Sequence, residues 1–327
     1  MEHFSNYARE VVETIKPKKE ELVIDIGSND GTLLQSFRGY GLRVLGIEPA
    51  EHIAKKATEN GTETMPNFFT SDVASSIRER YGKAKIITAN NVLSNIDDLG
   101  HVIDNVHDLL TPDGVFITEV FYLGDLIKNM VFDYIYHEHL DYHSIIPLKY
   151  FLENHKMQLL DVKEVPTKCG SLRCIIQRSD GPHKEAESVM HQITKEKERG
   201  LHEPGIFSEF NKKIISARRN LEEILERSEK KKIAAYGASI TCTALTYHFD
   251  LGRHFSFIVD DNPTRQGLYS PGLHRPVLSP ELFYERKMDA VLILAWRYAD
   301  SIIKKNKSFL ERGGQFVIPL PEARIIS

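Results

Sequence analysis

Cysteine is scarce in this sequence of 327 residues, and long apolar runs and an excess of basic charge are missing. The three cysteines, Cys169, Cys174 and Cys242, are too few and too scattered for a disulfide framework or a four-cysteine zinc site. No apolar run approaches the length that spans a bilayer, and the N-terminus lacks a basic region followed by an apolar one. We therefore expect a cytoplasmic protein without a membrane partner. The net charge of -4 also disfavours nucleic acid as a partner.

The composition that remains is that of a globular protein with two domains. Hydrophobic residues make up 41% of the chain and charged residues 27%, which are ordinary values for a folded protein. The length exceeds that of one ordinary domain, and each half is long enough to bury a core of its own. We predict a first domain over residues 1–180, a helical connection over 181–230 and a second domain over 231–327.

Residues 23–34 have the pattern of a buried strand that breaks at two glycines and turns at once into a helix. Gly27 and Gly31 allow the backbone to pass close to a ligand, and the start of the helix presents unpaired amides and a positive dipole end. A dinucleotide site needs G-x-G-x-x-G, whereas Asn29 stands where the middle glycine would be, and Asp25 precedes the turn. This spacing argues against a pyrophosphate ligand and therefore against an NAD-dependent oxidoreductase.

A carboxylate follows the next predicted strand. Residues 43–47 form a short apolar run that ends in Glu48 and Pro49, roughly twenty residues after the turn, where an acidic side chain can accept the hydroxyls of a ribose. Further along, Phe68 or Phe69 can stack on an adenine. The two motifs together resemble the first two motifs of class I methyltransferases that use S-adenosylmethionine (SAM). A plain strand-to-helix turn without a ligand is the alternative.

The alternation of strands and helices predicts an α/β fold, a Rossmann-like first domain followed by a second Rossmann-like domain. Residues 3–16 should form an amphipathic helix, and further apolar strands are expected at 85–89 and 115–120. Ligands of such sheets gather at the carboxyl ends of the parallel strands, so polar residues after these strands are expected to face the site. They are Asn90 and Asn91 for the cofactor and Tyr122 for the substrate.

Residues 132–144 hold three histidines, three tyrosines, two aspartates and one glutamate in thirteen positions. A metal site is one interpretation, but the His-x-His spacing is not the H-E-x-x-H motif, and we predict no metal. A polar surface loop with aromatic side chains beneath it is another. We favour acid–base chemistry, because an imidazole flanked by a carboxylate and a phenol can move a proton near neutral pH. The candidates are Tyr136, Glu138 and His139.

The second domain repeats the strand–turn–helix pattern with fewer glycines. A strand at 232–236 breaks at a small-residue turn, and Asp260 follows the next strand, where an acidic residue would meet a ribose hydroxyl. The turn either binds the diphosphate of a nucleotide at the helix start or belongs to a fold that binds nothing. Its candidate residues are Gly237, Ala238, Ser239 and Thr241.

Six motifs spread over nearly the whole chain carry a resemblance to a known family. They are residues 23–34, Gly46-Ile47-Glu48-Pro49-Ala50, Ala89-Asn90-Asn91-Val92-Leu93, Tyr136-His137-Glu138-His139, Gly170-Ser171-Leu172-Arg173 and Leu292-Ile293-Leu294-Ala295-Trp296. With them the chain resembles the deoxysugar C-methyltransferases, SAM enzymes that methylate C3 of a nucleotide-linked 4-keto sugar. The resemblance implies SAM as the cofactor and His139 as the base, with Tyr136 and Glu138 beside it.

The sequence also departs from that family. Family members begin with a small zinc domain that holds four cysteines, and this sequence starts just after it. We therefore expect that domain elsewhere in cis or on a partner chain in trans. Asn95 stands where a histidine is common, and Lys168 and Cys169 stand where His-Gly is usual. These differences bear on the identity of the sugar more than on the SAM site.

The function that the sequence predicts is C-methylation at C3 of a nucleotide-linked 4-keto deoxysugar. His139, oriented by Glu138, would remove the C3 proton, and Tyr136 or a water would stabilise the enolate oxygen. The alternatives are methylation of an oxygen or nitrogen on a sugar nucleotide, and a nucleotide-sugar-binding subunit without catalysis. We expect the substrate to lie between the domains. Its expected contacts are Tyr122, His137, Tyr142, Arg173, Gly237, Ala238, Ser239, Thr241, Asp260 and Trp296.

Overall fold

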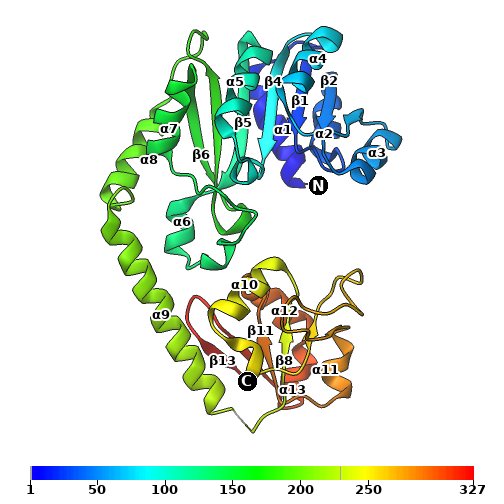
Figure 1. Cartoon of the computed structure of the whole chain (residues 1–327), viewed down its shortest axis with the longest axis vertical. Coiled ribbons are helices and arrows are strands. Elements are labelled where there is room, and N and C mark those ends of the chain that lie inside the picture. The colour runs from blue at the N-terminus through cyan, green and yellow to red at the C-terminus, as the bar shows by residue number, and fades with distance from the viewer. Residues whose placement is uncertain (1, 229) are drawn as a thin grey trace. The chain divides into compact units, whose positions relative to one another are not determined.

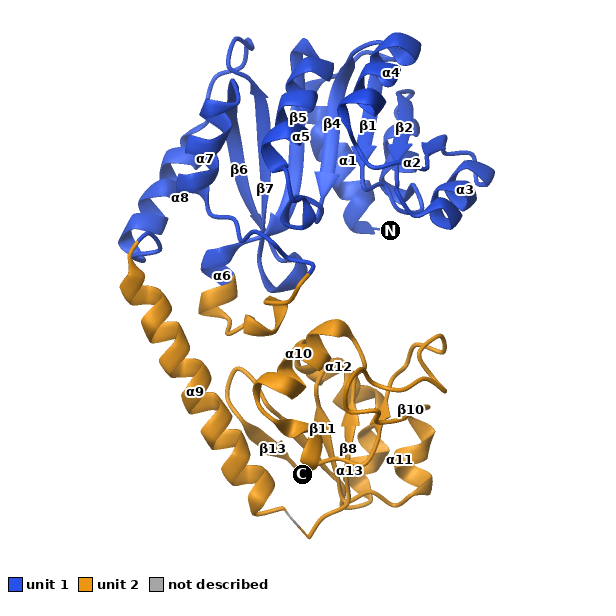
Figure 2. Cartoon of the chain, viewed as in Figure 1, with its two compact units in different colours: residues 1–125, 138–202 blue, residues 126–137, 203–327 orange. Residues whose placement is uncertain are grey.

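The structure, a computed structural model, describes residues 2–228 and 230–327 and divides the chain into two compact units. Unit 1 comprises Met1–Asp125 and Glu138–His202, and unit 2 comprises Leu126–His137 and Glu203–Ser327 (Figure 2). Each unit is built around one sheet flanked by helices, which confirms the predicted α/β class (Figure 1). Within the described ranges, no helix combines the length and the apolar character needed to cross a membrane.

The sheet of unit 1 has the strand order β3-β2-β1-β4-β5-β7-β6. Its strands are β1 (Leu22–Ile26), β2 (Arg43–Ile47), β3 (Thr64–Met65), β4 (Ala84–Asn90), β5 (Leu110–Phe121), β6 (Met157–Val165) and β7 (Ser171–Arg178). Strands β1 to β5 run parallel, and β6 and β7 form an antiparallel hairpin at the other end of the sheet. The strand order reverses between β1 and β4, so the carboxyl ends of these two strands form the switch point where such sheets bind ligands.

The helices of unit 1 pack on this sheet through apolar faces. They are α1 (Glu2–Ile15), α2 (Thr32–Arg38), α3 (Glu51–Glu59), α4 (Ser71–Tyr81), α5 (Leu99–Leu109), α7 (Ile145–Asn154) and α8 (Glu187–Glu198), with the 3-10 turns η1 (Leu93–Asn95) and η3 (Thr167–Cys169). The predicted N-terminal helix is α1, which buries Tyr7 and Val11 in one core with Leu34 and Phe37 of α2. Burying a side chain of this size contributes about 1.5–3 kcal/mol, so packing rather than intrinsic propensity holds α1.

Unit 2 has a sheet in the order β10-β9-β8-β11-β12-β13, in which β13 is antiparallel to β12. Its strands are β8 (Ile233–Tyr236), β9 (Ile258–Val259), β10 (Val277–Leu278), β11 (Ala290–Ile293), β12 (Gln315–Ile318) and β13 (Arg324–Ile326). Its helices are α9 (Pro204–Glu226), α10 (Ile240–His248), α11 (Glu281–Glu285), α12 (Ala299–Lys305) and α13 (Lys307–Glu311), with the 3-10 turns η4 (Leu251–Arg253) and η5 (Trp296–Tyr298). The order again reverses beside the first strand, between β8 and β11, which gives unit 2 its own switch point.

The segment Leu126–His137 belongs to unit 2, although its neighbours in the chain on both sides belong to unit 1. It contains the end of α6 (Leu123–Lys128) and the 3-10 turn η2 (Phe132–Tyr134). The reason is local packing, because the buried ring of Phe132 lies 5.1 Å from each of the rings of His248 and Phe249, at the end of α10. The predicted boundaries of the functional domains, at residues 180 and 230, stay a prediction.

Candidate active site

The turn between β1 and α2 is shaped by backbone that only small or tolerant residues adopt. Gly27, Asn29 and Gly31 all have positive φ, at 72°, 49° and 78°. A Cβ atom on Gly27 would lie 2.4 Å from Cγ2 of Val92, so glycine is required there for space as well as for conformation. The amide of Gly27 donates to the carbonyl of Ile47 at 2.8 Å, which ties the turn to the end of β2.

Glu48 braces this turn from the end of β2. Its Oε2 accepts the amide of Asn29 at 3.0 Å, and its Oε1 accepts the amide of Ala50 at 2.9 Å. The side chain is half-buried, and among the described residues no Lys, Arg or His forms an ion pair with it. A carboxylate has about four acceptor positions, so the predicted ribose-binding residue keeps lone pairs that these two amides do not use.

Asp25, inside β1, is a buried carboxyl with an unusual affinity for its proton. Burial raises the pKa of Asp25 to about 7, a hydrogen bond from Thr88 opposes this, and the charge of Glu48 adds to it. The Thr88 hydroxyl donates to Oδ1 of Asp25 at 2.6 Å. A cationic group of a ligand placed here would be stabilised by the ionised form of Asp25.

Several buried polar atoms at this edge of the sheet have no hydrogen-bond partner among the described residues. They are the side-chain oxygens of Ser28 and Ser94, both amide atoms of Asn90 and Oδ1 of Asn91. Leaving a buried donor or acceptor unpaired costs about 1–3 kcal/mol, so such atoms usually mark the place of a water or ligand. Their residues lie at the end of β4 and directly after β1 and β4, where the switch point lies. Together with the turn, Glu48 and Asp25, they fit the hydroxyls, ring nitrogens and amino group of SAM.

The remaining predicted cofactor residues differ in how far they are exposed to solvent. Phe69 is buried, with 8% of its surface exposed, whereas Phe68 is 75% exposed. Pro49 is also exposed, at the start of the chain from Glu48 to α3. Their contacts with adenine or ribose stay predictions.

The loop after β5 brings His139 to the same edge of the sheet as the cofactor residues. The ring centroid of His139 lies 4.7 Å from that of Phe121, the last residue of β5, and Tyr142 lies 5.6 Å from the same ring. The amide of Leu140 donates to the carbonyl of Ser94 at 2.7 Å, so the loop crosses from β5 to the end of β4. His139 is half-buried, which suits a base that must meet a substrate.

The compact units divide the predicted catalytic run. Glu138 and His139 lie in unit 1, and Tyr136 and His137 lie in unit 2. Glu138 and His137 are exposed and Tyr136 is half-buried. The roles of these residues stay predictions. Within the described residues, no group of three or more His, Cys, Asp or Glu side chains is arranged to hold a metal ion.

His143 is a half-buried residue of the same loop, which the sequence suggests only as a possible metal ligand beside the His-x-His pair. Its Nε2 is buried with no hydrogen-bond partner in the described parts of the chain, and its backbone pairs with Tyr122 at the end of β5. Burial lowers the pKa of His143, which the charge of Asp141 partly opposes, so its imidazole favours the neutral form. The available signal was its place in the histidine-rich loop.

Arg173, predicted to bind substrate, is already engaged by two carboxylates. Its Nε and Nη2 donate to Oε2 of Glu119 at 3.1 and 2.9 Å, and its Nη1 donates to Glu10 at 2.9 Å. Its guanidinium also lies 3.9 Å from the ring centroid of Tyr7. The structure therefore places its charge in a compensated network, and a contact with substrate stays a prediction.

Tyr122 is also placed in the interior, with none of its surface exposed. Burial raises the pKa of its phenol, and the charge of Glu196 adds to this. Glu196 itself accepts the amides of Ile145 and Ile146 at the start of α7, at 2.6 and 3.0 Å. Tyr122 therefore lies in the interior of unit 1, close enough to Glu196 of α8 to feel its charge, and its predicted substrate contact stays a prediction.

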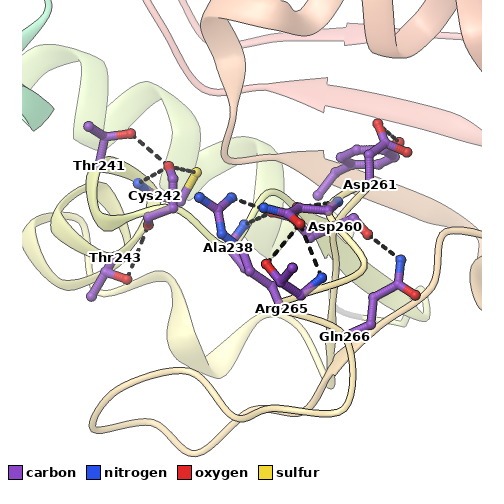
Figure 3. A network of polar contacts seen from close by, with 12 residues as sticks. Ala238, Thr241, Cys242, Thr243, Asp260, Asp261, Arg265 and Gln266 are labelled. Carbon is purple, nitrogen blue, oxygen red and sulfur yellow. Dashed lines mark hydrogen bonds and ion pairs between the residues drawn. The ribbon is translucent and has the colours of Figure 1, made fainter. Parts of the chain in front are cut away.

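In unit 2 the turn between β8 and α10 has its own polar network (Figure 3). Gly237 has φ 110°, and Ser239 is the N-cap of α10, with its Oγ accepting the amide of Cys242. The Asp260 carboxylate accepts the amide of Ala238 at 2.7 Å and the guanidinium of Arg265 at 3.2 Å. The charge of Asp260 is therefore compensated before any ligand binds.

A small pocket of about 90 Å³ lies beside this turn. Gly237, Arg265 and the exposed ring of Tyr269 are among the residues that line it. Thr241 and Trp296 do not line this pocket: both are buried, and the indole nitrogen of Trp296 donates to Asp133 at 3.1 Å. Thr241 still belongs to the turn, because its Oγ1 lies 2.9 Å from Oγ of Ser239. The predicted substrate residues that the structure groups around this one turn are Gly237, Ala238, Ser239, Thr241 and Asp260.

Comparisons with known proteins identify the family to which the chain belongs. Residues 1–158 match the family described as "Methyltransferase domain", and residues 166–321 match the one described as "C-methyltransferase C-terminal domain". The chain is 34% identical over 330 residues to the C-methyltransferase NovU of Streptomyces niveus, a match that covers 100% of this chain and 79% of NovU.

Solved methyltransferase structures are similar over about half of the chain. Magnesium protoporphyrin IX methyltransferase (ChlM) from Synechocystis PCC 6803 with bound SAH has a TM-score of 0.42 and 17% identity, covering 54% of this chain and 82% of its own. A S-adenosylmethionine-dependent methyltransferase from Clostridium acetobutylicum ATCC 824 has a TM-score of 0.41 and 14% identity, covering 55% of this chain and 91% of its own.

Proposed function

Because this chain belongs to the family of C-methyltransferases that includes NovU, and is a SAM-dependent methyltransferase, we propose that it methylates C3 of a nucleotide-linked 4-keto deoxysugar. Carbon is a poor nucleophile unless a neighbouring group can hold the charge that deprotonation leaves behind. A ketone beside the reacting carbon does so, because the charge then rests on oxygen. C-methylation therefore requires a base near the cofactor, and the substrate must carry an acidified C–H bond.

One observation carries this proposal: a histidine and the cofactor residues share one edge of one sheet. His139 packs on Phe121 at the end of β5, and the next residue is bonded to Ser94 after β4. The unpaired polar atoms of Asn90 and the turn braced by Glu48 follow β4, β1 and β2 in the same unit. A base and a bound cofactor at the same edge can act on one carbon atom.

The chemistry of the residues then follows from their positions. When bound, SAM supplies a methyl group on a positively charged sulfur. His139 in its neutral form accepts the C3 proton, and Glu138, next to it in the chain, holds the imidazole in the required orientation. Tyr136 donates a hydrogen bond to the enolate oxygen. Much of the rate comes from holding the deprotonated carbon in line with the methyl group.

Unit 2 would hold the part of the substrate that does not react. The turn after β8 offers backbone amides at the start of α10, and Arg265 adds a cation that is partly exposed beside it. These groups suit a diphosphate. Binding energy from the nucleotide can then be used to position the sugar for deprotonation.

Exchange of the C3 proton for deuterium, without SAM, tests the proposal. The wild-type protein should exchange the proton in a panel of nucleotide-linked 4-keto deoxysugars, and His139→Gln should reduce the exchange rate about 10²- to 10⁴-fold. The matched control is His143→Gln, in the same loop, which should retain most of the exchange.

Loss of exchange in His143→Gln, with exchange retained in His139→Gln, would move the base to His143. Methyl transfer by the wild type to an oxygen or nitrogen, without any C3 exchange, would contradict the proposed substrate position.

A further inference from the structure

A buried ion pair within unit 2 holds the segment that leads into the predicted catalytic run. The side chain of Asp133 is fully buried, and its two oxygens lie 2.7 and 2.6 Å from Nη1 of Arg297. Its Oδ2 also accepts the indole N–H of Trp296 at 3.1 Å. Only 9% of the Arg297 side chain is exposed. The proposed reaction assigns no task to this pair.

Stability alone does not account for a charged pair at this place. Removing two charges from water costs about as much as their attraction returns, and well-packed apolar residues are often as stable. Phe132 next to Asp133 already supplies apolar packing against Phe249. The ion pair adds a defined geometry, because Asp133 must face both Arg297 and Trp296 for its oxygens to be satisfied.

The other side of the same guanidinium reaches the turn between β8 and α10. Nη2 of Arg297 donates to Oγ1 of Thr241 at 2.8 Å, and that oxygen lies 2.9 Å from Oγ of Ser239, the N-cap of α10. Arg297 also lies 4.7 Å from the ring centroid of Tyr134. One cation therefore joins η2 to the turn where the diphosphate is proposed to bind.

The segment held by Asp133 continues directly into the candidate catalytic residues. Tyr136 is three positions beyond Asp133, and the chain passes from unit 2 to unit 1 between His137 and Glu138. The orientation of η2 thus limits the positions that the backbone of Tyr136 can take. Only two residues separate Tyr136 from His139.

We propose that Asp133 and Arg297 are positioning residues that couple the turn between β8 and α10 to the run Tyr136–His139. The ligand of that turn rests on the function proposed above. Arg297 contacts the carboxylate of Asp133 directly and reaches the turn through its hydrogen bond to Thr241. A diphosphate bound at the turn would therefore interact with the same guanidinium as Asp133. Occupancy of the turn therefore orders η2 and the residues that follow it.

Hydrogen–deuterium exchange of the full chain tests the coupling with thymidine or uridine diphosphate as the probe. In the wild type, the probe should slow amide exchange in both 237–246 and 130–139. In Asp133→Asn, which keeps the shape but removes the charge, ligand-free exchange in 130–139 should rise about tenfold, and the probe should protect 237–246 only. SAM affinity should stay within twofold of wild type, because the cofactor residues lie in unit 1.

Protection of 130–139 by the probe in Asp133→Asn would overturn the coupling. If the probe protects neither region of the wild type, the proposed diphosphate site is wrong, and the coupling that depends on it fails as well. Faster ligand-free exchange in 130–139 of Asp133→Asn would then show the anchoring alone. If Asp133→Asn does not fold, Trp296→Phe removes one hydrogen bond of the same cluster and serves instead.

A double variant separates positioning from simple stability. Asp133→Asn leaves the Arg297 charge buried without its partner, and Asp133→Asn with Arg297→Gln removes both charges. The double variant should recover the melting temperature lost in the single one but keep fast exchange in 130–139 and a roughly tenfold lower kcat, with KM for SAM unchanged. Recovery of exchange and kcat together with stability would show a merely structural role. Arg253→Gln, at an ion pair with Glu222 in the same unit, is the control that should leave 130–139 unchanged.

Discussion

Glu48 in unit 1 and Asp260 in unit 2 occupy equivalent places in two similar sheets. Each follows a parallel strand that pairs with the strand before the glycine turn. Each carboxylate accepts one amide from that turn and a second amide two residues further along its own chain. In both units an acidic side chain therefore stabilises the turn through a hydrogen bond, independently of any ligand.

The two carboxylates differ in what else they contact. Asp260 is 7% exposed and pairs with the guanidinium of Arg265 at 3.2 Å. Glu48 is half-buried, and its electrostatic neighbour is another acid, Asp25. An uncompensated carboxylate attracts hydroxyl and amino donors, whereas a carboxylate neutralised by an arginine leaves a site that tolerates an anion. The difference supports a ribose at Glu48 and a phosphate near Asp260.

The largest expected effect comes from the glycine that opens the first turn. Gly27→Ala should lower the free energy of unfolding by about 2–4 kcal/mol and abolish measurable SAM binding, because the new Cβ meets Val92 and the residue has positive φ. Thermal unfolding and titration calorimetry measure both. Adding Val92→Ala should recover part of the stability by removing the clash, without correcting the backbone. An unchanged melting temperature in Gly27→Ala would contradict the geometry of this turn.

Substitutions of Glu48 and Asp260 should differ in their effect on SAM binding. Glu48→Ala should weaken SAM binding by about 1.5–3 kcal/mol, roughly tenfold or more, because two ribose hydroxyls lose a charged acceptor. Asp260→Ala should leave SAM affinity unchanged. Calorimetric titration of both variants with SAM makes the comparison, and equal affinities for wild type and Glu48→Ala would remove the ribose from Glu48.

Arg265 should matter for the anion in unit 2 only. Arg265→Gln should weaken binding of a nucleoside diphosphate about three- to tenfold at low salt and reduce its salt dependence, because one partly exposed cation is lost. Binding is measured at two ionic strengths. Arg253→Gln, on the same unit but away from the turn, is the control. Identical salt dependence in wild type and Arg265→Gln would show that Arg265 does not face the ligand.

The smallest expected effect is a partial release of a proton by Asp25 when SAM binds. The pKa of Asp25 is raised from 3.8 to about 7 by burial, against the Thr88 hydrogen bond and with the Glu48 charge adding. Folding then favours the protonated form, so the contribution of Asp25 to stability is largest below about pH 4, declines as the pH rises to about 7 and is constant above that. SAM carries a net positive charge, which favours the ionised carboxylate. Its binding near pH 7 should therefore release a fraction of a proton.

Calorimetry in two buffers with different ionisation enthalpies measures this release. It should disappear in Asp25→Asn and fall to near zero in the wild type above about pH 9, where the carboxyl is already ionised. Proton release that persists in Asp25→Asn would assign it to another group. The Thr88→Val variant sharpens the result, because losing a hydrogen bond to the ionised form should raise the pKa of Asp25 further.

The turn between β1 and α2 could be predicted because its signals are local. Gly27 and Gly31 are needed wherever a strand must turn at once into a helix, and both have the positive φ that their spacing indicates. The position of Glu48 could also be predicted. After the glycine turn, a helix and a second parallel strand of ordinary length occupy about twenty residues, so an acidic residue at that distance lies at the end of the second strand. The α/β class follows from the same alternation and is confirmed.

The assignment of Arg173 and Asp260 as ligand residues rested on their sequence positions, and those positions do not report charge compensation. Glu119 is 54 positions from Arg173, and no periodicity links them. Arg265 is only five positions after Asp260, yet the irregular segment between them does not determine from sequence alone where the Arg265 side chain points. His143 received no catalytic or binding role for the same reason, since burial of one ring nitrogen depends on strands that meet only in the folded chain.

By itself the sequence determined the α/β class and the turn between β1 and α2, because these depend on backbone sterics and on apolar spacing within about ten residues. The tertiary structure decided which charges remain available to a ligand and to which unit each predicted catalytic residue belongs. Asp133 lies 164 positions from Arg297, and their ion pair joins η2 to the rest of unit 2, as does the packing of Phe132 on Phe249. Electrostatic energy depends on distances between side chains and on their burial, and folding alone brings such distant groups together and removes their water.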